Sequence, residues 1–379
     1  MPLYLTFALM LFCFASISSA RVVLSLYALH LGGQPFAVGA LVATFYLFPL
    51  VLSWPIGILS DRAGSRGLLL FGTVCGAGGM AIPYFVRDLP ALYVAGTMIG
   101  ISFSFYNVLL QNLVGLLSKP HERVRNFSNS SLIGAFTNFA GPLLVGFSID
   151  HWGHAVACLY VASLSLVAAV LVSVWGGVLP GGTRNAAPAA SFREILADKG
   201  MLRILVISGL AQVGQDLYQF YIPVYGYAIG LSASAIGSVI AAFAMAAFVV
   251  RFVMPGLILR VGEERVLVYS FALAAAGFLL VPFFTLTIAL AIISFVFGLG
   301  MGCCQPITTA LLFSRSAEGR SGEILGLRQS VNNIMRVSGP PLFGLIASAF
   351  GLPPVFWLSA LIMAAGGWIT RPEAGRKER

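Results

Sequence analysis

The feature that most constrains this chain is a succession of apolar runs, each as long as a membrane-crossing helix. A helix needs about 20 mostly apolar residues to cross ~30 Å of hydrocarbon. The 379 residues contain twelve such runs. Their approximate limits are 3–31, 36–60, 67–86, 90–117, 126–149, 153–178, 203–229, 233–259, 266–285, 287–314, 323–350 and 352–370. The pattern predicts an all-α integral membrane protein with twelve transmembrane helices.

Composition supports the same conclusion. Charged residues make up 9% of the chain and hydrophobic residues 59%, whereas a soluble domain carries about 25% charged residues. A water-soluble enzyme and a disordered chain are both excluded. Residues 15–20 resemble a signal-peptide cleavage region, but no basic residue precedes the apolar stretch, and apolar sequence continues to Leu31. We therefore expect the first run to be retained as a span.

Lysine and arginine predict the orientation, because cytoplasmic connectors carry an excess of both. The connectors after even-numbered spans and the C-terminal tail hold 17 of them, and the connectors after odd-numbered spans hold only Arg87. Both termini and the central linker are therefore expected in the cytoplasm, with the protein in the plasma (inner) membrane. The net charge of +9 is a signal of topology, and we expect no nucleic-acid partner.

The two halves of the chain overlay at one fixed offset of 198 residues. The shift takes Gly141-Pro142 to Gly339-Pro340, since 339 − 141 = 198, and it also takes Arg62-x-Gly64 to Arg260-x-Gly262. Because six spans separate the copies, both enter the membrane in the same sense, which makes a parallel repeat typical of secondary transporters. The predicted organisation is an N-terminal six-helix half (1–178), a cytoplasmic linker (179–202), a C-terminal six-helix half (203–371) and a cytoplasmic tail (372–379).

Polar residues inside the spans are unevenly distributed. The third, sixth, ninth and twelfth spans hold no Asn, Gln or charge in their interiors, so they can face lipid. The seventh and eleventh spans each carry a polar stripe on one helical face. We expect the polar side chains to line a shared substrate cavity, or, as an alternative, to hold helices together. The candidates are Gln212, Gln215, Gln219, Tyr218, Asn332, Asn333, Arg336, Asn107, Gln111, Asn138 and Gln305.

The connector after the second span reads Gly57-x-x-x-Asp61-Arg62-x-Gly64-x-Arg66. It resembles the signature loop of the major facilitator superfamily, in the position where that family has it. The resemblance covers essentially the whole chain and implies the fold of that family. It also implies that these residues form a conformational latch, with Asp61 near the N-terminal end of the eleventh helix, where the helix dipole favours a carboxylate.

A second, partial resemblance concerns the Gly-Pro motif that marks the fifth helix of many exporters of the family. This chain has Gly141-Pro142 in the fifth span and Gly339-Pro340 in the eleventh. The Gly-Pro pair can be interpreted either as this export motif or as a simple helix kink. The arginine that family antiporters often carry early in the fourth helix is replaced by Gly96, which places proton antiport by the usual residues in doubt.

Asp216 is the only carboxylate deep inside a span. We predict that it and Arg21 couple transport to protons, with protonation of Asp216 releasing Arg21. A permanent buried ion pair is the alternative. Arg251 and Arg328 lie nearer the cytoplasmic ends and are expected to snorkel to the membrane surface. With Arg21 and Arg336 against one carboxylate, the predicted cavity suits an anionic or zwitterionic solute.

The sequence therefore predicts a secondary active transporter for a small organic solute, working by alternating access, with proton-coupled efflux as the leading direction. Proton-driven uptake of an organic anion or iron chelate is the alternative, and a non-transporting receptor is a remote one. No catalytic motif is present, so no enzyme activity, cofactor or metal is expected. The expected partners are the solute, protons or another coupling ion, and the lipid bilayer, and the expected state is a monomer.

Overall fold

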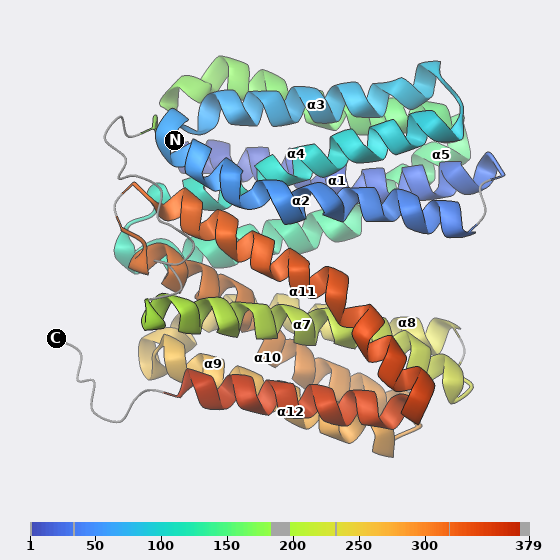
Figure 1. Cartoon of the computed structure of the whole chain (residues 1–379), viewed down its shortest axis with the longest axis vertical. Helices are drawn as coiled ribbons and strands as arrows, with labels where there is room; N and C mark the ends of the chain where they lie inside the picture. Colours follow the sequence, from blue (N-terminus) through green and yellow to red (C-terminus); the bar gives the residue numbers. More distant parts are fainter. Residues whose placement is uncertain (1, 33–34, 183–197, 232, 318, 372–379) are drawn as a thin grey trace. The chain divides into compact units, whose positions relative to one another are not determined.

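The structure is a computed structural model and describes residues 2–32, 35–182, 198–231, 233–317 and 319–371. Most of the predicted linker and tail therefore lies outside the described residues. The described part is built from long helices joined by short connectors (Figure 1). The α-helices are α1 (Pro2–His30), α2 (Pro35–Ala63), α3 (Ser65–Phe85), α4 (Leu89–Leu116), α5 (Arg123–Trp175), α7 (Lys199–Ala228), α8 (Ala233–Val261), α9 (Glu263–Leu280), α10 (Thr287–Arg315), α11 (Ser321–Phe350) and α12 (Leu352–Thr370).

The long helix α5 contains two predicted crossings. Its 53 residues would extend for ~80 Å if unbroken, far beyond the thickness of a bilayer. The helix is broken at Gly153, whose φ of 78° and ψ of 170° are non-helical. A side chain is strongly disfavoured in this backbone region, so glycine is needed there. The break divides α5 into parts that correspond to the fifth and sixth spans.

Among the described residues, nine helical segments are long and apolar enough to cross a membrane, with 120–178 counted as one. The two long helices outside that set are α7 and α11, which carry the polar stripes noted in the sequence. Once α5 is divided at Gly153, the helices match the twelve spans expected from the sequence. The all-helical membrane fold is thus confirmed.

The internal repeat is also visible in backbone conformation. Gly32, Gly64 and Gly153 have positive φ, and so do Gly230, Gly262 and Gly351, each 198 residues later. The limits of α2 shift by the same amount onto those of α8, because 35 + 198 = 233 and 63 + 198 = 261. The duplication therefore reproduces turns and helix lengths as well as sequence.

The chain forms two compact units. Unit 1 contains residues 1–189 and 313–333, and unit 2 contains residues 190–312 and 334–379. Within unit 1, α1 packs against α5, and α4 packs against α2 and α3; within unit 2, α12 packs against α9 and α7. Residues 313–333 thus cluster with the N-terminal half, whereas the sequence places them in the C-terminal half. The helix α11 contributes to both units.

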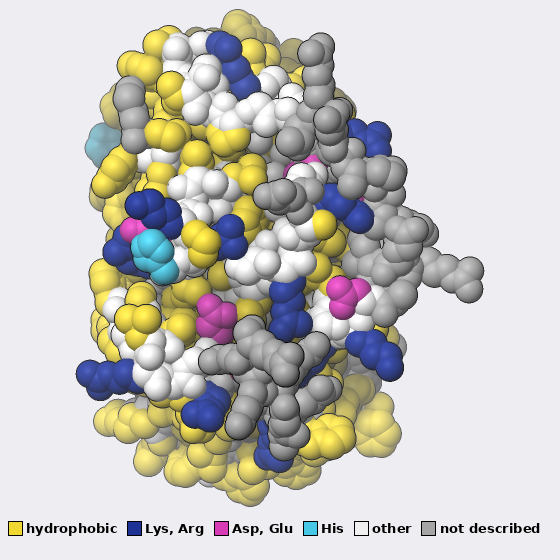
Figure 2. Space-filling view, turned by 90° about the vertical axis from the view of Figure 1, so that its left-hand side faces the viewer, with side chains coloured by type: hydrophobic (Ala, Val, Ile, Leu, Met, Phe, Trp, Pro, Cys, Tyr) yellow, Lys and Arg dark blue, Asp and Glu magenta, His cyan; other side chains and the backbone are white. Residues whose placement is uncertain are grey.

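Apolar side chains are exposed on the spans that lack interior Asn, Gln or charged residues. Examples are Phe71 on α3, Val170 on the part of α5 after Gly153, Tyr269 on α9 and Leu361 on α12. Most lysine and arginine residues are instead found at helix ends and in connectors, as with the exposed Arg62, Arg66 and Arg260. Figure 2 shows such basic side chains in dark blue over one end of the helices, bordered by hydrophobic side chains in yellow. This distribution suits helices whose flanks face lipid and whose ends face water.

Candidate functional site

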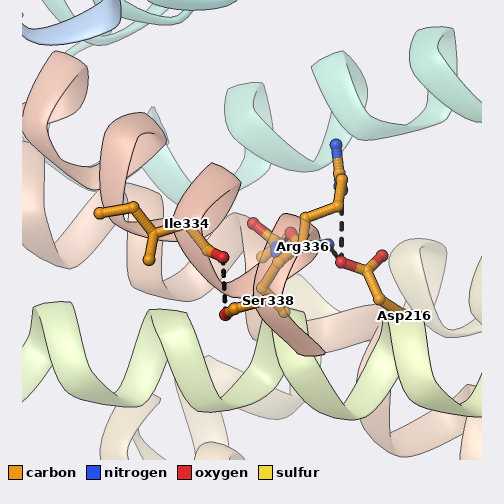
Figure 3. A network of polar contacts seen from close by, with 6 residues as sticks. Asp216, Ile334, Arg336 and Ser338 are labelled. Atoms are coloured by element: carbon orange, nitrogen blue, oxygen red, sulfur yellow. Dashed lines mark hydrogen bonds and ion pairs between the residues drawn. The ribbon is translucent and has the colours of Figure 1, made fainter. Parts of the chain in front are cut away.

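The strongest concentration of charge inside the spans is an ion pair in unit 2. Arg336 of α11 places Nε 3.2 Å from Oδ2 of Asp216 on α7. Figure 3 shows this contact as a dashed line between the Arg336 side chain and an oxygen of Asp216. Their side chains are 32% and 19% exposed, respectively. A charge at this depth in a membrane helix is found facing a protein interior or water, because acyl chains offer no partner.

Two amides extend the pair into a chain of hydrogen bonds. Gln212, one turn before Asp216 on α7, donates from Nε2 to Asp216 Oδ2 over 2.9 Å. Gln305 of α10 donates to Gln212 Oε1 over 2.8 Å. The carboxylate therefore accepts from two helices, and a third helix orients one of its donors. Such a network fixes the orientation of the Asp216 carboxyl group, and removing one member of the Asp216–Arg336 pair would leave the other without this partner.

The remaining candidates on α7 differ in their surroundings. Gln215 is half-buried and Gln219 is exposed. Tyr218 is 1% exposed, stacks on Phe297 with ring centroids 3.9 Å apart, and contacts Ser294 through its hydroxyl. Its position in an aromatic cluster of unit 2 favours a packing role for Tyr218 over contact with a solute.

A second polar group lies in unit 1, on α1 and its neighbours. Arg21 Cζ lies 5.2 Å from the ring centroid of Tyr46 on α2 and 5.3 Å from that of Phe103 on α4. One turn earlier on α1, Ser18 donates a 2.8 Å hydrogen bond to Oδ1 of Asn138 on α5. These distances suit cation–π contacts of Arg21 with both rings. The predicted pairing of Arg21 with Asp216 joins residues of different units and stays a prediction.

Two of the polar contacts between α4 and α11 within unit 1 involve candidate residues from the sequence. Gln329 donates to Asn107 over 3.0 Å, and Arg328 donates to Gln111 over 3.3 Å. Arg328 is only 2% exposed. The expectation that Arg328 snorkels to the membrane surface is therefore wrong, because helix packing encloses its side chain. Asn332, one turn after Arg328, is buried as well, and so is Asn333.

Asp61 lies at the first turn of α11. Its carboxylate accepts hydrogen bonds from the backbone N–H groups of Gly322 and Glu323, each over 2.9 Å. Gly57 allows this approach, since a Cβ at that position would collide with the Gly322 backbone. The geometry is the one that the family resemblance implies, and a carboxylate is favoured there by the helix dipole. Arg62 and Arg66 are exposed, and Arg66 donates to the Ser173 carbonyl over 3.1 Å.

Two residues that contact each other beside Asp61, Asn112 and Ser321, were not predicted from the sequence. Asn112 donates to Asp61 Oδ1 over 3.4 Å and accepts a 2.6 Å hydrogen bond from the Ser321 hydroxyl. Asn112 directly follows the candidate Gln111, so the sequence could have indicated it as a further polar residue of the fourth span. Asn112 is 1% exposed, so its amide ties α2, α4 and α11 together inside unit 1.

The structure describes the surroundings of Gly141-Pro142 in α5 but not those of Gly339-Pro340 in α11. A Cβ at Gly141 would lie 3.0 Å from the Ser19 hydroxyl and 3.1 Å from Ser18 Cβ, closer than ordinary van der Waals contact, so this glycine permits the close packing of α5 on α1. Pro142 follows within the helix. Gly339 and Pro340 lie in α11, but their side-chain surroundings are outside the part of the chain that the structure describes.

An aromatic group lies near the break in α5. The His154 ring stacks on His30 at 4.5 Å and on Tyr27 at 5.4 Å between ring centroids. Among the described residues, no set of three or more His, Cys, Asp or Glu side chains is arranged to hold a metal ion. The cluster is a packing contact between the end of α1 and the second part of α5.

Comparison with known proteins gives a consistent result. The family model described as "Major Facilitator Superfamily" matches residues 6–337 and 204–379. The second match begins 198 residues after the first, since 204 − 6 = 198.

Two relatives and one solved structure illustrate the similarity. The chain is 23% identical to a multidrug resistance protein of Klebsiella pneumoniae, covering 85% of this chain and 80% of that protein. It is 24% identical to the class G tetracycline resistance protein of Vibrio anguillarum, covering 82% and 80%. The human organic anion transporter MFSD10 has a similar fold, with a TM-score of 0.81 at 14% identity over 97% and 98% of the two chains.

Proposed function

The chain belongs to the major facilitator superfamily of membrane transporters, and from that premise we propose that it exports a small organic solute in exchange for protons. The solute is anionic or zwitterionic. The two six-helix halves, 1–178 and 203–371, alternate access to a site near the midplane of the membrane. The protein acts as a monomer in the plasma membrane, with both termini in the cytoplasm.

The observation that carries this proposal is the partly exposed ion pair between Asp216 and Arg336. Protonation of Asp216 removes the charge that compensates Arg336, so the attraction between α7 and α11 is weakened. Loss of the proton restores it. A proton can therefore change the relative stability of two arrangements of these helices, which is what coupling to a gradient requires.

Similarity to named exporters supports the direction. The proteins that the chain resembles are named for multidrug and tetracycline resistance, which a transporter can confer by exporting the drug. Identity of 23–24% over about four-fifths of the chain does not transfer their substrates, so the solute class is argued from the charges inside the spans. Two arginines and one carboxylate occupy the middle of the polar spans in the sequence, at Arg21, Arg336 and Asp216.

Reconstitution into liposomes tests the function. Tetracycline serves as a zwitterionic probe, carboxyfluorescein as an anionic probe and ethidium as a cationic one. An exchanger accumulates its solute when the liposome lumen is more acidic than the bath, whereas a proton symporter does so when the bath is more acidic. We expect an acidic lumen to drive accumulation of an anionic or zwitterionic probe. Accumulation driven only by an acidic bath would support uptake instead.

Asp216→Asn tests the coupling role. We expect this variant to equilibrate the transported probe without responding to a pH gradient, because position 216 no longer binds and releases a proton. Asp198→Asn is the matched control, directly before the first residue of the same helix. Asp198 accepts from the N–H of Gly200 at the start of α7, over 2.9 Å, and asparagine can replace it as a helix cap. A wild-type response to the gradient in Asp216→Asn would contradict the coupling role.

A further inference from the structure

The carboxyl group of Asp216 in unit 2 uses only one of its two oxygens for contacts within the protein. Gln212 Nε2 and Arg336 Nε both donate to Oδ2, over 2.9 Å and 3.2 Å. Within the part of the chain that the structure describes, Oδ1 accepts no hydrogen bond. A carboxylate accepts through both oxygens. Because the Asp216 side chain is 19% exposed, Oδ1 is an acceptor that a solute can reach.

Two amides on the same helix also have polar groups that the protein leaves unused. Gln215 and Gln219 belong to the polar stripe of α7, the first half-buried and the second exposed. Neither makes a hydrogen bond to another described residue, whereas Gln212 in the same stripe both donates and accepts. An amide in a membrane span is expected to face a protein partner or a wet cavity and not lipid. These two amides are therefore placed to contact a solute.

We propose that Asp216 Oδ1 and the amides of Gln215 and Gln219 form a subsite for the primary ammonium group and the carboxylate of a zwitterionic solute. The ammonium donates to Oδ1, and the amide NH₂ groups donate to the solute carboxylate. This inference rests on the proposed function and deepens it, because that function leaves anionic and zwitterionic solutes as alternatives.

The spacing of the three side chains suits a compact zwitterion. Residues three or four apart on a helix have Cβ atoms about 5–6 Å apart. Asp216 and Gln219 are three apart, and Gln215 and Gln219 are four apart. In an α-amino acid the ammonium and the carboxylate are attached to the same carbon atom. One such solute can therefore contact the carboxyl group and a neighbouring amide together.

The charges beside the subsite favour a solute that carries both signs. Asp216 and Arg336 form a pair of opposite charges, so the pair as a whole is neutral. A solute with a carboxylate alone is repelled by Asp216, and a solute with an ammonium alone lies close to the positive charge of Arg336. A zwitterion presents its positive group to Asp216 and leaves the ion pair balanced, with no further charge buried among the helices.

The acceptor oxygen also discriminates between kinds of cation. A hydrogen bond to Oδ1 requires an N–H donor, which a primary ammonium has and a trimethylammonium lacks. Hydrogen bonds between charged partners are shorter and stronger than those between neutral ones. Two zwitterions that differ only in methylation of the nitrogen are therefore expected to bind with different affinities, although their charges are the same.

Binding to the full-length protein in nanodiscs at neutral pH tests the subsite without requiring transport. The probes are phenylalanine, N,N,N-trimethylphenylalanine, 3-phenylpropanoate, which lacks the ammonium, and 2-phenylethylamine, which lacks the carboxylate. All four share an apolar body, since small-molecule sites combine mostly apolar walls with a few placed polar groups. We expect phenylalanine to bind at least about tenfold more tightly than each of the others, given the strength of a charge-assisted hydrogen bond.

Variants assign the recognition to its residues. Asp216→Asn is expected to lose the preference for phenylalanine over 3-phenylpropanoate, because the neutral amide no longer attracts the ammonium. Gln219→Leu is expected to weaken phenylalanine binding several-fold and to retain the preference for phenylalanine over its trimethyl derivative, since Oδ1 is unchanged. Asp198→Asn, at the start of α7, is the matched control and is expected to bind all four probes as the wild type does. If Asp216→Asn does not fold, Gln219→Leu and the four probes on the wild type still decide the outcome.

Equal or higher affinity of the wild type for N,N,N-trimethylphenylalanine, or wild-type selectivity in Asp216→Asn, would overturn the subsite. The same holds if none of the four probes binds, and the transport function would then depend on the liposome result alone. Selective, Asp216-dependent binding of phenylalanine without gradient-driven transport would instead support the subsite and contradict the exporter function.

Discussion

At the scale of single residues, the buried carboxylate of Asp61 illustrates how a short motif acquires a role. Asp61 accepts two backbone N–H groups at the first turn of α11 and one amide N–H from Asn112. The first N–H groups of a helix have no partner inside the helix. A carboxylate placed there satisfies two of them and also interacts favourably with the helix dipole. The start of α11 is therefore held to α2 by charge as well as by packing.

Asp61→Asn is expected to loosen this contact and leave the fold intact. Loss of the negative charge at a helix N-terminus costs about 0.3–1 kcal/mol and up to ~2 kcal/mol when partly buried. The reporter is a cysteine at Ser53, a fully buried position on α2 whose carbonyl faces Gly326 of α11, in a background without the native cysteines. A membrane-impermeant maleimide is expected to label it several-fold faster in Asp61→Asn.

The control is Asp88→Asn, which changes an aspartate that caps α4 by accepting from the Ala91 N–H over 2.8 Å. This cap acts within one helix, so labelling at position 53 is expected to match the wild type. Equal labelling rates in Asp61→Asn and Asp88→Asn would show that the contact of Asp61 with α11 does not restrain α11.

At the scale of helices, the break at Gly153 divides α5 between two crossings of the membrane. Its repeat partner is Gly351, which separates α11 from α12 with a φ of 83°. Both glycines combine a positive φ with a ψ near 180°, at 170° and 179°, a backbone region in which L-residues are strongly disfavoured. The same turn is therefore built twice, once inside each copy of the repeat.

Gly153→Ala is expected to lower stability by about 1–3 kcal/mol, the usual cost of holding a side chain in such a region. Gly351→Ala is expected to have a similar effect. The control is Gly146→Ala, since no atom lies within 4 Å of a Cβ there and alanine favours a helix. Thermal unfolding in detergent measures all three. An unfolding temperature for Gly153→Ala equal to that of Gly146→Ala would contradict the strain argument.

At the scale of the whole molecule, apolar flanks and basic helix ends together define how the chain lies in a membrane. The chain carries 22 Lys and Arg against 13 Asp and Glu. The basic residues follow the even-numbered spans, whereas the connector between α3 and α4 carries Arg87. Positive charge is retained on the cytoplasmic side. Because this connector has Arg87 as its one basic residue, it is expected on the opposite side.

Reporter fusions check this topology. A fluorescent protein that matures only in the cytoplasm, joined after Arg379, is expected to fluoresce. Alkaline phosphatase, which is active only outside the cytoplasm, is expected to be active when fused at Arg87 and inactive when fused at Arg125. The reverse pattern at either phosphatase site would mean that the positive charges do not set the orientation.

The sequence alone determined the membrane fold, the twelve spans, the repeat and the resemblance to a transporter family. These properties depend on local hydropathy and on a fixed offset of 198, so each can be read along the chain. It also marked most polar residues of the site, since Asn, Gln and charged groups are conspicuous in an apolar span.

Only the tertiary structure decided which polar residues meet. Asp216 pairs with Arg336, 120 residues away, a contact that the sequence did not single out. Helix packing encloses Arg328 against α4, although its place along the chain predicted exposure at the surface. The tertiary structure also groups residues 313–333 with the first half of the chain, in unit 1. Such contacts depend on the rotation and packing of helices distant in sequence, and hydropathy does not encode either.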